Sequence, residues 1–79
     1  MRFKILLIIF ISSYAVAFSQ DDSEKYLSDG IAQYNNRNFK DAIILFDKAL
    51  NINPNSTITY YHRSLANIEL QKYLDAIQV

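Results

Sequence analysis

The sequence resembles itself at a spacing of 34 residues, and this internal similarity restricts the folds that the chain can adopt. Without a gap, the spacing pairs Tyr26 with Tyr60, Ala32 with Ala66, Asp41 with Asp75, Ala42 with Ala76 and Ile43 with Ile77. Most of these positions are apolar or small, and such positions set the distance between packed helices. The spacing therefore predicts an array of equal helical units, in which the second unit is incomplete at Val79.

Apolar residues recur at helical spacing from Asp22 onward, and Gly and Pro each occur once in the chain. This pattern predicts an all-α fold of antiparallel helix-turn-helix units. We expect helices over residues 23–36, 39–51 and 57–70, and a fourth helix that starts near Tyr73.

The polar and proline-containing segments predict where these helices end. Asn38 is expected to cap the second helix, and Ser56 or Asn55 the third. Pro54 cannot continue a helix and disfavours helical geometry at the residue before it, so it predicts the end of the second helix. Gln71 or Lys72 is expected to precede the fourth helix.

A 34-residue unit that has Pro54 near its end begins at Ser23. Small residues, aromatic residues and one leucine then fall at the positions that bring two helices together, namely Gly30, Phe39, Ala42, Phe46, Ala49 and Leu50. This arrangement resembles the tetratricopeptide repeat family, whose unit is a pair of antiparallel helices. The resemblance implies an α-solenoid with a short segment at 20–22, a first repeat over 23–56 and a truncated second repeat over 57–79.

The sequence also departs from the family pattern. Asp29 stands where the family usually has leucine, Gln33 stands where it usually has tyrosine, and Ser64 replaces the glycine in the second copy. These differences are expected to loosen the packing of the first helix of each pair.

In the tetratricopeptide family, the first helix of each pair lines a concave face that holds a partner peptide. The resemblance implies a groove formed by Leu27, Ile31, Tyr34, Asn35, Tyr61, Leu65, Ile68 and Glu69. This mixture suits an extended or helical peptide with hydrophobic anchors, and it has no Lys/Arg clamp for a strongly acidic tail. The alternative is that the apolar members simply form the core between helices.

The N-terminal residues have the three-part layout of a secretory signal peptide, which we predict over residues 1–19. Arg2 and Lys4 form a basic start, an apolar run covers residues 5–11, and small residues dilute it over residues 12–19.

Two cleavage sites satisfy the requirement for small residues before the cut, one before Gln20 and one before Phe18. The first is preferred because it leaves a polar N-terminus. The alternative is an uncleaved inner-membrane anchor over residues 5–18, although a spanning helix needs about 20 residues.

The amino-acid composition limits the cellular compartment, the metal sites and the partners that the chain can have. The chain has no Cys, so it has no disulfide and no thiolate metal site. Export without disulfides favours a bacterial periplasm or cell envelope. Beyond residue 19 there are six basic and eight acidic residues, and the basic ones are scattered, which argues against nucleic acid as a partner.

We predict no catalytic, cofactor-binding or metal-binding residue. His62 is the only histidine and has no acidic residue or Cys four positions later, so a helix-borne metal site lacks a second ligand. His62 and Ser64 are two residues apart and face different sides of a helix, which excludes an unaided nucleophile and base pair.

The sequence thus predicts a non-catalytic protein-interaction module that binds a protein or peptide segment. One alternative is a truncated fragment of a longer repeat protein, with no independent function. A homo-oligomer that forms through the open C-terminal end is a further possibility. The fragment alternative arises because removal of residues 1–19 would leave about 60 residues, fewer than the roughly 70 to 80 at which a core without disulfides or metals is stable. A domain accessory to an enzyme is the third interpretation.

Overall fold

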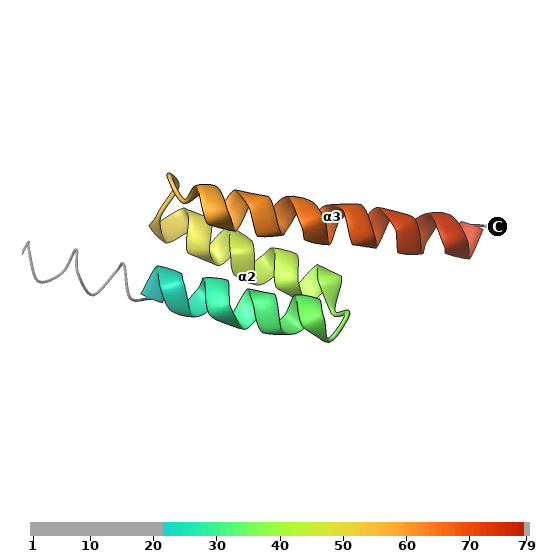
Figure 1. The fold of residues 1–79 in the computed structure, drawn as a ribbon, viewed down its shortest axis with the longest axis horizontal. Coiled ribbons are helices and arrows are strands. Elements are labelled where there is room, and N and C mark those ends of the chain that lie inside the picture. Colours follow the sequence, from blue (N-terminus) through green and yellow to red (C-terminus); the bar gives the residue numbers. More distant parts are fainter. Residues whose placement is uncertain (1–21, 79) are drawn as a thin grey trace, which may run out of the picture.

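The computed structural model describes residues 22–78, and in this range the chain forms three helices and no strand. The first helix runs over residues 22–35, α2 over Phe39–Ile52 and α3 over Thr57–Gln78 (Figure 1). The predicted all-α class is confirmed, and the first three helices begin and end close to the expected residues, except at the end of α3. The predicted signal peptide, both cleavage sites and the alternative anchor lie outside the described residues.

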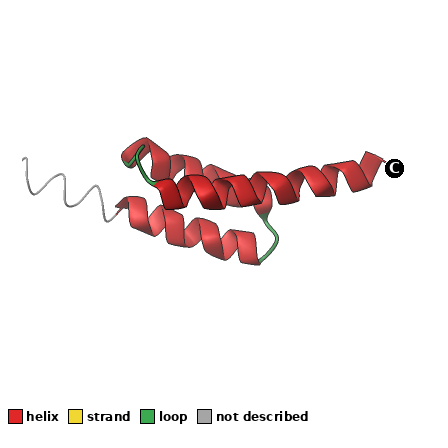
Figure 2. Cartoon of the chain, turned by 45° about the horizontal axis from the view of Figure 1, so that its top comes forward, coloured by secondary structure: helices red, strands yellow, loops and turns green. Residues whose placement is uncertain are grey.

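The three helices lie side by side and alternate in direction, and α3 continues beyond the other two (Figures 1 and 2). Short connections over residues 36–38 and 53–56 join them, and short connections favour antiparallel neighbours. Within the described residues, no helix is long and apolar enough to cross a membrane.

A hydrogen-bonded turn ends the first helix. The Asn38 backbone N–H donates to the Gln33 carbonyl oxygen, and the Arg37 N–H donates to the Tyr34 carbonyl oxygen, each at 2.9 Å. Together these bonds form a Schellman motif, which needs a residue in the left-handed region. Arg37 supplies that residue, with a φ of 65°.

Asn38 is the N-cap residue of α2, as predicted. Its side chain makes no capping hydrogen bond, and its Nδ2 donates instead to Gln33 Oε1 at 2.9 Å. Asn38 has φ −88° and ψ 69°, outside the extended geometry of a capping residue, because the Schellman turn fixes its backbone.

The start of α3 agrees with the sequence. The Thr59 N–H donates to the Ser56 hydroxyl oxygen at 3.3 Å, so Ser56 caps the helix. The two hydroxyl groups lie 2.7 Å apart, which satisfies the side chain of Thr59, only 1% exposed.

The predicted fourth helix is wrong, because α3 continues without a break to Gln78. Residues 69–72 occupy the positions that the 34-residue spacing assigns to the first turn. They read Glu-Leu-Gln-Lys, all good helix formers, where the first turn reads Asn-Asn-Arg-Asn. Side-chain bonds from Lys72 to Glu69 (3.3 Å) and from Gln71 to Asp75 (2.9 Å) further favour the helix across this point.

The core is centred on Phe46, which is fully buried with Ala42 and Ala66. The partly buried side chains of Leu27, Ile31, Tyr34 and Ile43 pack around this cluster. The core therefore joins all three helices.

Gly30 lies directly against the Phe46 ring. A Cβ atom added at Gly30 would lie 2.5 Å from Cε1 and 2.7 Å from Cδ1 of this ring. The absence of a side chain at Gly30 is what allows the first helix to approach α2 this closely.

We therefore expect Gly30→Ala to destabilise the fold, although alanine is intrinsically about 1 kcal/mol better than glycine in a helix. Overpacking costs about 1–3 kcal/mol, so the free energy of unfolding should fall by up to about 2 kcal/mol once the helix gain is subtracted. Urea unfolding followed by circular dichroism measures the change. Ser28→Ala, at an exposed position of the same helix, is the matched control and should not lower the midpoint. A Gly30→Ala midpoint equal to or above wild type would contradict this packing.

Candidate functional site

The eight predicted groove residues fall into two groups. Leu27, Ile31 and Tyr34 are partly buried and pack against the core cluster, so they hold the helices together. Of the others, Leu65 and Glu69 are partly buried, and Asn35, Tyr61 and Ile68 are exposed. On the first helix, the core therefore uses most of the apolar side chains that the prediction assigns to a partner.

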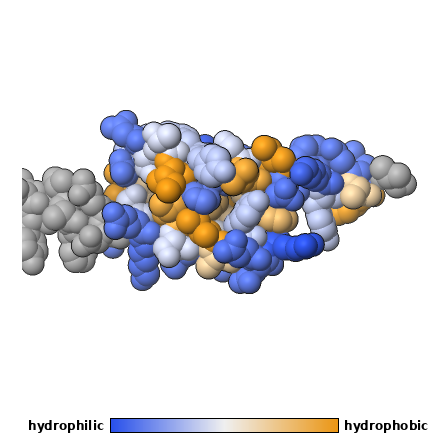
Figure 3. All heavy atoms as spheres, in the orientation of Figure 1, coloured by the Kyte–Doolittle hydropathy of each residue, from blue (hydrophilic) through white to orange (hydrophobic). Residues whose placement is uncertain are grey.

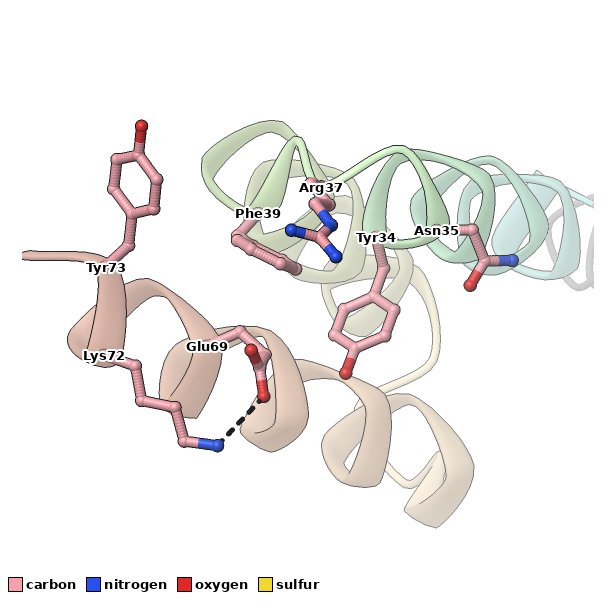
Figure 4. A pocket seen from close by; sticks show the side chains of 7 residues that line it. All are labelled: Tyr34, Asn35, Arg37, Phe39, Glu69, Lys72 and Tyr73. Atoms are coloured by element: carbon pink, nitrogen blue, oxygen red, sulfur yellow. Dashed lines mark hydrogen bonds and ion pairs between the residues drawn. The ribbon is translucent and has the colours of Figure 1, made fainter.

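A cleft of about 550 Å³ opens where α3 passes the turn between the first helix and α2. It is lined by Tyr34, Asn35, Arg37, Phe39, Glu69, Lys72 and Tyr73 (Figure 4). Tyr34, Asn35 and Glu69 belong to the predicted groove, so the structure brings these three together across two helices.

Aromatic rings form part of the cleft wall. The rings of Tyr34 and Phe39 meet edge to face, with centroids 5.4 Å apart and planes at 64°. Such contacts fix ring orientation beyond what burial alone achieves. Tyr73 lines the cleft from α3 and is 63% exposed. The Tyr34 and Phe39 rings therefore form a rigid wall for an apolar or aromatic group of a ligand, and the exposed Tyr73 side chain can adjust to it.

The charged side chains come from both sides of the cleft. Lys72 Nζ lies 3.3 Å from Glu69 Oε1 on α3, and Arg37 comes from the turn (Figure 4). The cleft thus carries two cations and one carboxylate. The predicted groove includes neither cation, because the repeat pattern assigns partner contacts only to the first helix of each pair.

The predicted groove lacks four residues that line the cleft, namely Arg37, Phe39, Lys72 and Tyr73. The repeat pattern assigns Phe39 to the core, and it places Lys72 and Tyr73 at a break between helices. The helix-forming residues over 69–72 are the one sequence signal that could place Lys72 and Tyr73 on the same helix as Glu69.

Beside the cleft, α3 exposes apolar side chains. Tyr61 is 61% exposed and Ile68 is 51% exposed. Figure 3 shows apolar patches between hydrophilic side chains on the face in view. Clustered apolar groups at a surface are typical of interaction sites.

His62 packs between aromatic neighbours. Its ring stacks on Phe46 at a centroid distance of 6.1 Å and meets Tyr61 edge to face at 5.4 Å. Among residues 22–78, no group of three or more His, Cys, Asp or Glu side chains could hold a metal ion. These contacts give His62 a packing role.

Comparison with protein-family models, curated proteins and solved structures finds no match to this chain. The resemblance to tetratricopeptide repeats therefore stays a prediction from the residues. The cleft and the exposed face of α3 are the features of the described residues that bear on function.

The turn beside the cleft gives a direct test of its geometry. A residue with a side chain loses about 1–2 kcal/mol in the left-handed region, whereas glycine does not. Glycine loses more backbone entropy on folding, so Arg37→Gly should stabilise the fold by about 0.5–1 kcal/mol in total. Thermal and urea unfolding measure the gain.

Lys40→Gly removes the same charge within α2 and should cost about 0.5–1 kcal/mol. The left-handed turn would be contradicted if Arg37→Gly lowered stability as Lys40→Gly does.

Proposed function

We propose that this chain is a non-catalytic protein-interaction module of the tetratricopeptide type. Its binding surface comprises the cleft and the exposed apolar face of α3 beside it. The cleft carries the proposal, because it combines aromatic walls with charged and amide groups from two helices. Sites for peptides and small ligands commonly combine apolar walls with a few polar groups that fix orientation.

The lining of the cleft indicates the kind of segment that would bind. Tyr34, Phe39 and Tyr73 suit an apolar anchor, while Asn35 and Glu69 offer an amide and a carboxylate to backbone or side-chain donors. Tyr61 and Ile68 extend the apolar surface along α3. A peptide longer than the cleft would therefore continue onto α3.

The resemblance to tetratricopeptide repeats supports the same proposal. The first helix and α2 form an antiparallel pair, with Gly30 and Phe46 at the closest contact. In this proposal, α3 takes the place of the first helix of a second unit. Its uninterrupted course to Gln78 departs from that unit and lengthens the surface beside the cleft.

The proposed place of action is the periplasm or cell envelope of a bacterium. The signal-like residues 1–19 support export, and the absence of Cys is compatible with that compartment. An inner-membrane anchor over residues 5–18 is the alternative means of keeping the module at the envelope.

A displayed library of random peptides tests the proposed function, because such a selection needs no partner of known sequence. The full chain should select peptides that share apolar anchors, with dissociation constants in the micromolar range, about −8 kcal/mol. Fluorescence anisotropy with one selected peptide gives the affinity.

Ile68→Lys places a charge in the apolar part of the surface and should weaken binding at least about tenfold. Ile44→Lys on α2 is the matched control, because Ile44 and Ile68 are both 51% exposed. Selection of no peptide, or equal binding by both variants, would contradict the proposal.

A further inference from the structure

Four residues of α3 lie on one side of the helix and outside the core cluster. They are Tyr61, Leu65, Ile68 and Lys72, at successive spacings of four, three and four residues. This spacing produces a continuous seam along a helix, typical of helices that pack against a partner helix. Tyr61 and Ile68 are exposed, Leu65 is partly buried, and the Lys72 side chain is 69% exposed.

The seam is complementary to itself when a second copy runs in the opposite direction. If a two-fold axis passes between Ala66 and Asn67, Leu65 lies opposite Ile68 of the second copy, and Tyr61 lies opposite its Lys72. Each pair occurs twice, as a two-fold interface requires. The result is an apolar centre with one cation and one aromatic ring at each end.

We propose that this face of α3 binds a second copy of the same chain, with the two α3 helices antiparallel. The inference rests on the proposed function, since it names an occupant for part of that interaction surface.

Charge and ring chemistry favour this occupant. An ammonium group over the face of a tyrosine ring is attracted to it. Lys72 pairs with Glu69 of its own helix at 3.3 Å (Figure 4), in an exposed contact of a kind that contributes little. Lys72 can therefore turn toward the second copy's Tyr61 at small cost.

The charges also fix the direction of the pairing. A parallel pairing would instead place Lys72 against Lys72, and the like charges would repel.

The interface is small, which sets its strength. Contacts through one helix face belong to the weak end of protein interfaces, below about 1,200 Å². We expect a dissociation constant on the order of 10 μM, so the chain should be monomeric at nanomolar and dimeric at high micromolar concentration.

Sedimentation equilibrium of the full 79-residue chain tests the proposal. Leu65→Lys and Ile68→Asp should each weaken dimerisation at least about tenfold, because each introduces a charge into an apolar layer. An equimolar mixture of the two variants should restore dimers. In the mixed antiparallel pair, Leu65 of one variant still faces Ile68 of the other. At the second such contact, the introduced lysine faces the introduced aspartate.

Ile44→Lys is the control on α2 and should dimerise like wild type. Since Leu65 is partly buried, circular dichroism checks that its variant folds. If it does not, Lys72→Glu at an exposed position provides the second test and should weaken dimerisation at least about threefold.

A chain that stays monomeric at all concentrations would overturn the proposal. So would folded Leu65→Lys and Ile68→Asp variants whose mixture forms no dimers, or a Lys72→Glu variant that dimerises like wild type. Such a chain could still bind the selected peptides, in which case the proposed function stands. Dimers without peptide binding would overturn only the peptide-binding function.

Discussion

The structure depends on the contact between the Phe46 ring and Gly30. The ring is fully buried, and the two nearest ring atoms occupy space that any larger side chain at position 30 would need. Ala42 and Ala66 complete the cluster, and their small size lets α2 and α3 approach one another. The contact of the Phe46 ring with small residues on the neighbouring helices thus sets the distances between all three helices.

That packing also positions the binding surface. Tyr34 packs at the edge of the Phe46 cluster, and its ring contacts Phe39 at the start of α2. The Schellman turn at Arg37 brings the chain from one helix to the next in three residues, so the turn lies at the edge of the cleft. Since α3 continues past this turn, Glu69, Lys72 and Tyr73 form the opposite wall.

The sequence predicts the helices and the core well, because apolar periodicity and Pro54 are strong local signals. It also predicts a cap at Ser56 or Asn55, and the structure shows the cap at Ser56. The fourth helix is wrong, and Asn38 precedes α2 as predicted but makes no side-chain capping bond. The 34-residue spacing predicts a turn at the same place in both copies, but a turn forms only where the residues favour it, and residues 69–72 favour a helix. At Asn38, the Schellman turn fixes the backbone and directs the side chain away from the helix start. The cleft could not be predicted in full, because four of its lining residues belong to a turn, a helix start and a helix continuation that the repeat pattern does not assign to a surface.

Hydrogen exchange of the backbone amides tests most directly the central claim that Phe46 holds the three helices together. The amides around Gly30, Phe46 and Ala66 should exchange slowest and at similar rates, because they open only with the whole core. Residues 71–78 are exposed throughout and should exchange much faster, through local fraying of α3. A first helix that exchanges as fast as residues 71–78 would contradict the account, since it would show that the helix is not fixed against Phe46.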